Sequence, residues 1–217
     1  RHAPFYIATR VGIGEKPFRM VKLRSMIVGA DKTGVDSTAA EDARITRVGR
    51  IIRRYKLDEL SQLWNVLKGE MSLVGPRPNV PREVALYTAE EKRLLHVKPG
   101  ITDFSSIVFS DEGAVLAGSA DPDLKYHQII RPWKSRLGLL YVEKRSFFLD
   151  LRLIWLTLVA IFSRDKALKG LQPILRSLGA DEQLLAVARR QEPLPPFPPP
   201  GSDQIVGSFS NRVGKVD

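Results

Sequence analysis

The chain has 217 residues, of which 43% are hydrophobic, enough for one substantial domain with a buried core. It contains no cysteine and three histidines, which excludes disulfides, thiolate metal sites and cysteine nucleophiles and argues against a zinc site built on imidazoles. The net charge of +10 predicts a polyanionic partner: nucleic acid, anionic lipid or a phosphate-bearing small molecule.

The first part of the chain predicts a strand and two helices. Residues 16–26 interleave apolar and basic side chains, as in a strand with one basic face. A small, polar loop is expected over 29–42. Apolar residues at helical spacing then predict one helix over 44–55 and a second over Asp58–Leu67.

The middle of the chain predicts further helices and one more strand. Three prolines predict an ordered, non-helical turn over 75–84, before a helix that reaches residue 97. A turn into a strand is expected over 98–110, where β-branched residues recur. Residues 121–146 are expected to form two helices broken near Pro132, followed by an apolar helix over 147–162.

The apolar helix raises the question of a membrane. Its uncharged part, Leu153–Ser163, has 11 residues, whereas a bilayer-spanning helix needs about 20. We therefore expect a buried helix or one pressed into the headgroup region, where flanking Lys144 and Arg152 suit anionic lipid.

The composition changes near Arg164, where we place a boundary between a domain of residues 1–164 and a segment of residues 165–217. A helix is expected over 174–190. The proline-rich stretch 191–204 is expected to be extended and flexible, and the residues after it disordered.

Two adjacent carboxylates, Asp58 and Glu59, begin the second predicted helix. One interpretation is structural: Asp58 caps the helix and Glu59 occupies its first turn, where the helix dipole favours negative charge. The other is functional: the pair holds a divalent metal, or one carboxylate is a nucleophile that the other tunes.

Arginines close to this acid pair favour the functional interpretation. Arg47, Arg50 and Arg54 share one helical face with Arg53 beside them, and Arg77 is held between two prolines. A solvated basic face is the alternative for the cluster. Guanidinium groups bind phosphate oxygens bidentately, so the set is typical of metal-assisted phosphoryl transfer.

Other polar groups give weaker signals. Lys22 and Arg24 on the basic strand either join the site or are exposed, and the pair Asp111–Glu112 is expected in a turn. The histidines are scattered, and the sequence has no G-x-G-x-x-G, P-loop or G-x-S-x-G motif.

Three blocks of the sequence resemble the bacterial sugar transferase family. They are KPFRMVKLRSM, DARITRVGRIIRRYKLDELSQLWNVLKGEMSLVGPRP and KPGIT, in this order, within a match over about residues 4–162. Members are monotopic polyprenyl-phosphate phosphoglycosyl transferases, which begin the assembly of exopolysaccharide, O-antigen or glycoprotein glycans on the cytoplasmic face of the bacterial inner membrane.

The resemblance implies a reaction and a site. A nucleotide-diphosphate sugar, usually a UDP-sugar, gives its sugar-1-phosphate to undecaprenyl phosphate or a similar lipid, and UMP leaves. By position, Asp58 corresponds to the nucleophile that forms a covalent intermediate, and Glu59 to its partner. Magnesium is expected at Asp58 and Glu59, and Arg53, Arg77 and Lys22 are expected to bind substrate phosphate.

The sequence departs from the family in three respects. Members carry an N-terminal hydrophobic helix before the segment that matches Pro4–Tyr6, so this chain is expected to be a fragment. After PGIT many members have a GWAQVNGR-like sequence, whereas this chain has DFSSIVFSDEG, and Asp111 or Glu112 is a candidate contributor to specificity. The proline-rich tail has no counterpart.

The favoured prediction is therefore a membrane-associated, magnesium-dependent phosphoglycosyl transferase with an α/β fold of helices around a small sheet. A basic module that binds nucleic acid or anionic membrane without catalysis is the alternative, although the basic segments lack an aromatic stacking platform and no nucleic-acid partner is expected. A soluble nucleotide-sugar phosphodiesterase is a second alternative. The sequence leaves the oligomeric state open, a homodimer included.

Overall fold

The computed structural model describes residues 3–30, 38 and 41–208. The predicted mixed α/β class is confirmed: the described residues are mostly helical, with two small two-stranded sheets. The strands are β1 Phe5–Val11, β2 Pro17–Leu23, β3 Ser72–Val74 and β4 Gly100–Thr102. The helices are α1 Arg47–Arg54, α2 Leu57–Leu60, α3 Leu63–Leu67, α4 Pro81–Val84, α5 Phe104–Val108, α6 Glu112–Leu116, α7 Pro122–Ile129, α8 Arg131–Lys144, α9 Phe147–Phe162, α10 Arg164–Ser177 and α11 Glu182–Arg189.

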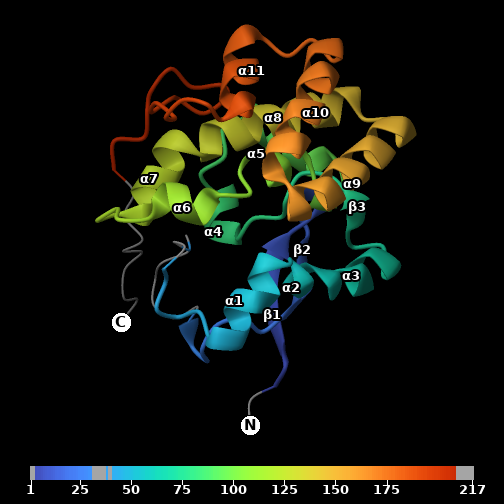
Figure 1. Cartoon of the computed structure of the whole chain (residues 1–217), viewed down its shortest axis with the longest axis vertical. Coiled ribbons are helices and arrows are strands. Elements are labelled where there is room, and N and C mark those ends of the chain that lie inside the picture. The colour runs from blue at the N-terminus through green and yellow to red at the C-terminus, as the bar shows by residue number, and fades with distance from the viewer. Residues whose placement is uncertain (1–2, 31–37, 39–40, 209–217) are drawn as a thin grey trace.

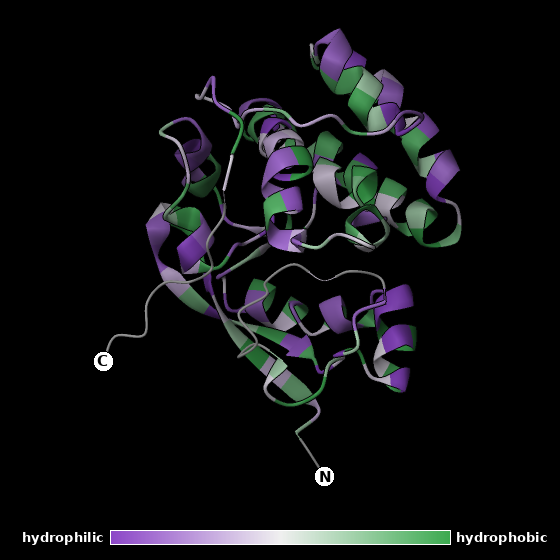
Figure 2. Cartoon of the chain, turned by 90° about the vertical axis from the view of Figure 1, so that its left-hand side faces the viewer, coloured by the Kyte–Doolittle hydropathy of each residue, from purple (hydrophilic) through white to green (hydrophobic). Residues whose placement is uncertain are grey.

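The elements form two layers. The β1–β2 hairpin and helices α1–α3 make the N-terminal layer, and helices α5 and α7–α11 make the other (Figure 1). The same division is visible from the side, with hydrophobic residues recurring along the hairpin and through the helices of both layers (Figure 2). Most of the predicted loop over 29–42 lies outside the described residues.

The hairpin is antiparallel and holds α2 and α3 in place. Buried Asn65 on α3 accepts a hydrogen bond from the Val21 backbone N–H at 3.0 Å and donates one to the Arg19 carbonyl at 2.8 Å. The Ser61 hydroxyl donates to the Val21 carbonyl at 3.1 Å. These hydrogen bonds satisfy backbone N–H and carbonyl groups of β2 close to Lys22, and they fix the acid pair of α2 against β2.

The predicted helix over 58–67 is wrong in its continuity, because it breaks into α2 and α3 around Ser61 and Gln62. Its polar residues Gln62 and Asn65 are buried, and its apolar stripe faces outward. Leu67 is 80% exposed and Trp64 56%. Asn65 is buried because it hydrogen-bonds to the strand, so hydrophobicity alone does not decide which face is buried.

The predicted strand over 98–110 is also wrong beyond Thr102. Asp103 accepts a hydrogen bond from the Ser106 backbone N–H at 2.7 Å, which caps and begins α5. The β-branched residues that suggested a strand are buried in the helical core, where packing overrides their propensity. The helix expected to reach residue 97 is only the single turn α4 and a 3-10 turn over Glu91–His96.

The break near Pro132 and the apolar helix over 147–162 are confirmed as α7, α8 and α9. The main hydrophobic core lies between α5, α8 and α9, and it continues without interruption into α10 and α11. Buried Leu171 and Leu185, which follow residue 164, pack in the same cluster as Trp133 and Leu153. The two C-terminal helices thus cover the core rather than stand apart from it.

The proline-rich segment is extended, as predicted, but it lies against α7 and α8. The Phe197 ring stacks on Trp133, with 4.5 Å between ring centroids, and the Phe197 N–H donates to the Gln128 carbonyl at 2.9 Å. Arg136 donates to the Pro198 carbonyl at 2.9 Å. The residues around Phe197 are thus held by an aromatic contact and two hydrogen bonds, and the expected flexibility of the stretch stays a prediction.

Candidate active site

The acid pair lies in the first turn of α2, at the boundary between the two layers. Lys56 precedes the pair in the left-handed conformation (φ 53°) and occupies the cap position. Asp58 is therefore not the helix cap, so the structural interpretation of that residue is wrong. Asp58 is 9% exposed, and no other described residue donates a hydrogen bond to its carboxylate or forms an ion pair with it.

Glu59 is held by an arginine from the other side of the site. The Arg77 guanidinium lies 2.8 Å from the Glu59 carboxylate and also donates to the Ile101 carbonyl at 2.8 Å. Desolvation raises the pKa of Glu59, but the charges of Arg77, Lys56 and Lys22 outweigh it, so the net pKa is below the usual value. Glu59 is thus an ionised anchor for Arg77.

Asp58 has the opposite electrostatic environment. Burial raises the pKa of Asp58 and the neighbouring charge of Glu59 adds to the effect, whereas Lys22 and Arg53 oppose it. Burial and the charge of Arg77 lower the pKa of Lys22 to about 8, against the opposing charge of Glu59. Adjacent carboxyl groups whose pKa values move apart are typical of groups with different chemical roles.

A cavity of about 480 Å³ opens in front of the pair. It is lined by α1, α2, the proline turn, α5 and α6, and the described residues around it include seven basic side chains and three acidic ones. The basic residues are Lys22, Arg50, Arg53, Arg54, Lys56, Arg77 and Lys134. This excess of positive charge suits an anionic ligand such as a diphosphate.

Two further cavities adjoin this outer cavity. An inner chamber of about 210 Å³ shares Lys22 and Arg77 with it and extends between α4, α7 and α8. A third cavity of about 390 Å³ lies along the hairpin and shares Lys22, Arg53 and Asp58. Asp58 is therefore reached from the outer cavity and from the hairpin side.

The five residues predicted as the site, Lys22, Arg53, Asp58, Glu59 and Arg77, all line the outer cavity. Their individual chemical roles stay predictions.

Other candidates from the sequence are placed elsewhere. Arg24 donates to the carbonyls of Ala3 and Phe5 and so closes the end of the hairpin. Asp111 forms ion pairs with Arg164 and Arg190, at 2.9 and 3.0 Å, and links α6 to the C-terminal helices.

Sequence reasoning missed several residues around the cavities. Lys56 is one, and its left-handed backbone places its amine 3.5 Å from the Ser106 carbonyl. Lys134 is another: it forms an ion pair with Glu112, which the sequence did suggest, at the boundary between the outer cavity and the inner chamber. Arg10 and Glu83 line the inner chamber. A basic residue in a strand and an acidic residue two positions after a proline give no local sequence signal of a binding site.

A magnesium ion fits this donor set in one way. Within the described ranges, no three histidine, aspartate or glutamate side chains converge as they would in a metal site made by protein alone. Magnesium, however, is commonly bound by one or two carboxylates together with substrate phosphates and water. Asp58 and Glu59 match that pattern when a diphosphate occupies the outer cavity.

Comparison with known proteins decides the family. A family model described as bacterial sugar transferase matches residues 1–164. The chain belongs to the bacterial sugar transferase family. It is 37% identical over 155 residues to the uncharacterised sugar transferase EpsL of Bacillus subtilis, covering 70% of this chain and 67% of EpsL. The expectation of a transferase is thereby confirmed.

Other members of the family have activities in their names. An undecaprenyl-phosphate glucose phosphotransferase of Komagataeibacter xylinus is 38% identical over 72% of this chain and 29% of its own length. A UDP-glucose:undecaprenyl-phosphate glucose-1-phosphate transferase of Caulobacter vibrioides is 33% identical over 73% of this chain and 57% of its own length. This chain therefore spans less than two thirds of either protein.

Proposed function

We propose that this sugar transferase moves sugar-1-phosphate from a nucleotide-diphosphate sugar, most simply a UDP-sugar, to a membrane polyprenyl phosphate such as undecaprenyl phosphate, with UMP as the leaving group. The observation that carries the proposal is the buried Asp58 carboxylate, without a pairing cation of its own, in a cavity lined mainly by cations. The names of the relatives support the same class of donor and acceptor.

Asp58 is the proposed nucleophile. A carboxylate oxygen of Asp58 attacks the phosphorus that bears the sugar, and the phosphoanhydride bond breaks so that UMP leaves with the electron pair. An oxygen of the polyprenyl phosphate then attacks the same phosphorus and displaces Asp58. The covalent step allows a soluble donor and a lipid acceptor to use one site in turn.

The cations of the site address the main barrier to this chemistry. A carboxylate and an anionic diphosphate repel each other, so the attack needs positive charge fixed where negative charge develops. Lys22 lies beside Asp58 in two cavities, and Arg53 joins it there. Arg77, held by Glu59 and the Ile101 carbonyl, is preorganised to bind phosphate oxygens.

Magnesium is proposed as the cofactor, held by Asp58 and Glu59 with the donor diphosphate. When bound, it would neutralise charge on the diphosphate and on the departing UMP. The protein's own part is to hold Asp58 unpaired, fix Arg77 through Glu59 and keep Lys22 close to the reacting phosphate.

The apolar outer surface suggests where the lipid acceptor approaches. On α3, Leu67 and Trp64 are exposed, and on α9, Phe162 and Trp155 are 89% and 65% exposed. Strand β3 packs beside both helices, which lie on the same side of the molecule (Figure 1). None of the helices formed by described residues is long and apolar enough to cross a bilayer. We assign this surface to an interfacial contact with the cytoplasmic face of the bacterial inner membrane.

The experiment is UMP release from a panel of UDP-sugars, with magnesium and polyprenyl phosphate in detergent, on wild type, Asp58→Asn and the remote control Asp165→Asn. A version with a membrane helix fused before Arg1 is assayed in parallel. Multiple-turnover release that needs lipid, magnesium and Asp58 supports the transferase. Continued release over many turnovers without lipid would instead indicate a phosphodiesterase, and no release from any donor would contradict the proposal.

A further inference from the structure

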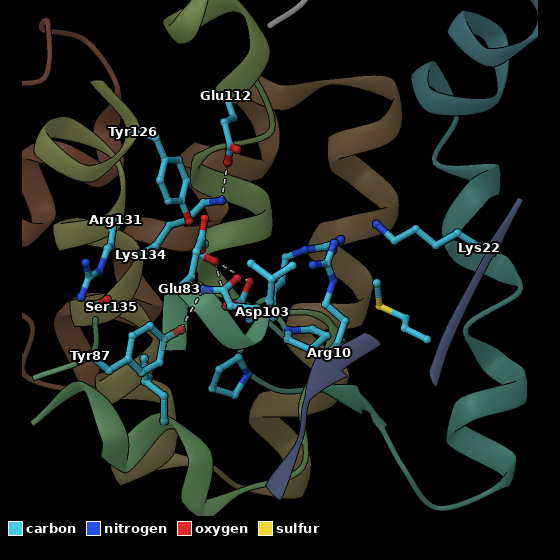
Figure 3. A pocket seen from close by; sticks show the side chains of 18 residues that line it. Arg10, Lys22, Glu83, Tyr87, Asp103, Glu112, Tyr126, Arg131, Lys134 and Ser135 are labelled. Carbon is cyan, nitrogen blue, oxygen red and sulfur yellow. Dashed lines mark hydrogen bonds and ion pairs between the residues drawn. The ribbon is translucent and has the colours of Figure 1, made fainter. Parts of the chain in front are cut away.

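The inner chamber has a lining unlike that of the outer cavity. It has less than half the volume, about 210 against about 480 Å³, and it mixes acidic, basic, hydroxyl and amide groups. In Figure 3, Glu83, Tyr126 and Lys134 lie on one side of the chamber, Lys22 approaches from the other, and Arg10 and Asp103 lie between them. A chamber with both donors and acceptors suits a ligand rich in hydroxyl groups.

Most charged groups of the lining already have partners. Arg131 is paired with Glu91 at 2.5 Å, and Lys134 is paired with Glu112. The Asp103 carboxylate accepts hydrogen bonds from the hydroxyls of Ser105 and Ser106. These interactions build the wall and leave little hydrogen-bonding capacity for a ligand.

Among the described residues of the lining, the exceptions are Glu83, Arg10 and the boundary residue Lys22. Glu83 is 9% exposed, yet no described residue donates a hydrogen bond to its carboxylate or forms an ion pair with it. The Arg10 guanidinium likewise has no hydrogen bond to a described residue, and its Nε is buried without a partner. Each group senses the charge of the other, but they do not form a direct pair. Burying polar groups of this kind costs folding free energy unless a ligand or water satisfies their hydrogen bonds.

The position of the chamber relative to the outer cavity indicates which part of a donor it could hold. Lys22 and Arg77 line both the chamber and the outer cavity, so a phosphate bound by them lies at the boundary between the two spaces. The sugar-bearing phosphate must also lie near Asp58, which faces the outer cavity. The two organic parts of the donor then occupy the two spaces, and the smaller chamber suits the smaller part, the sugar.

We propose that the inner chamber is the sugar subsite, in which Glu83 accepts and Arg10 donates hydrogen bonds to sugar hydroxyl or acylamino groups and thereby selects the sugar. This inference rests on the proposed function and adds to it the residues that choose among donors. A site built to hydrogen-bond a particular hydroxyl discriminates strongly against sugars that place it differently, because its own polar groups are then left unpaired.

The test compares wild type with Glu83→Gln, Arg10→Gln and the exposed control Glu143→Gln. The probes are UDP-glucose, UDP-galactose and their N-acetylated counterparts for turnover, and UDP, which lacks the sugar, for binding. Glu83→Gln keeps the size of the side chain and removes its charge. We expect it to lower kcat/KM for the preferred donor by about tenfold to a hundredfold, the effect of losing a hydrogen bond to a charged group. The ratio of kcat/KM between 4-epimers should fall towards one, while UDP affinity and the thermal melting temperature stay near wild type.

Arg10→Gln should change the same ratio, and Glu143→Gln should leave every value unchanged. Equal losses for all four donors in both chamber variants, or a loss of UDP affinity as large as that of the UDP-sugar, would overturn the sugar subsite while the transferase reaction stands. Absence of turnover by wild type with every donor would overturn the transferase proposal, and the subsite with it.

Discussion

The guanidinium of Arg77 lies 2.8 Å from the Glu59 carboxylate, and both side chains line the outer cavity. The neighbouring Asp58 carboxylate has no corresponding partner among the described residues. Glu59 thus holds the phosphate-binding group Arg77 in place, and Asp58 is left available for reaction. This difference in neighbours gives two adjacent carboxylates two different roles.

Replacement of Arg77 should reduce use of the donor far more than it reduces stability. Arg77→Ala removes a fixed group that donates hydrogen bonds to phosphate oxygens. Loss of one such preorganised donor lowers turnover by about a hundredfold to a thousandfold in other enzymes. UMP release and thermal melting should be measured on the same preparations. Arg77→Lys keeps the charge but not the planar fork, so it should recover only part of the activity. A loss of activity fully explained by unfolding would argue against this role.

Lys22 makes the reaction sensitive to alkaline pH. Because its pKa is lowered to about 8, it loses its charge in the free enzyme as the pH rises through that value, and kcat/KM for the donor should fall with it. Lys22→Arg keeps its charge throughout this range and should remove the alkaline fall. A pH–rate profile of both proteins between pH 6.5 and about 9.5 measures this, and an unchanged alkaline limb in the variant would contradict the assignment.

The same group affects stability in the opposite direction. The pKa of Lys22 is lower in the folded state than its ordinary value of 10.5, so the unfolded chain binds more protons between about pH 8 and 10.5. The contribution of Lys22 to the free energy of unfolding should therefore become more favourable as the pH rises through this window. Urea unfolding of wild type and Lys22→Met should be measured at pH 7 and pH 10. The free energy of unfolding of wild type, relative to that of Lys22→Met, should be higher at pH 10 than at pH 7. An unchanged or lower relative value at pH 10 would contradict the lowered pKa of Lys22.

The segment around Phe197 should stabilise the fold without taking part in the reaction. Phe197→Ala removes the ring stacked on Trp133 and the contact with Arg136, and we expect a loss of about 1–3 kcal/mol in the free energy of unfolding. UMP release by the folded variant should equal that of wild type. Pro195→Ala, at an exposed position two residues away, serves as the control. Equal stability of Phe197→Ala and the control would mean that this contact contributes nothing in solution.

The apolar outer surface should bind lipid. Trp155→Glu and Leu67→Glu place a charge at positions that are 65% and 80% exposed, so stability should change little while binding to vesicles with anionic lipid falls severalfold. Ile205→Glu, exposed on the C-terminal segment beside α7, is the matched control. Vesicle flotation that is unaffected by Trp155→Glu and Leu67→Glu would exclude this surface.

The sequence predicts the core of the site better than its surroundings. Asp58, Glu59 and Arg53 are neighbours along the chain, and Arg77 follows in a motif of restricted geometry, so their local pattern already suggested one pocket. The inner chamber could not be found in this way. Arg10 and Glu83 come from a strand and a single helical turn that meet only in the folded molecule.

The errors in the fold have a common physical cause. The buried side of α3 and the start of α5 both involve polar side chains that bond to backbone groups, Asn65 to the strand and Asp103 to its own helix. Hydrophobic periodicity does not register such bonds. The pattern found the apolar residues of 58–67 correctly, but it could not tell that they face outward.

The most direct test of the central claim is UMP release in the absence of a lipid acceptor. Wild type mixed with its UDP-sugar and magnesium should release about one equivalent of UMP per active site, as covalent catalysis requires. The Asp58 peptide should gain the mass of one sugar phosphate, and Asp58→Asn should show neither effect while melting at the wild-type temperature. Release of UMP by Asp58→Asn at the wild-type rate would show that Asp58 is not the nucleophile.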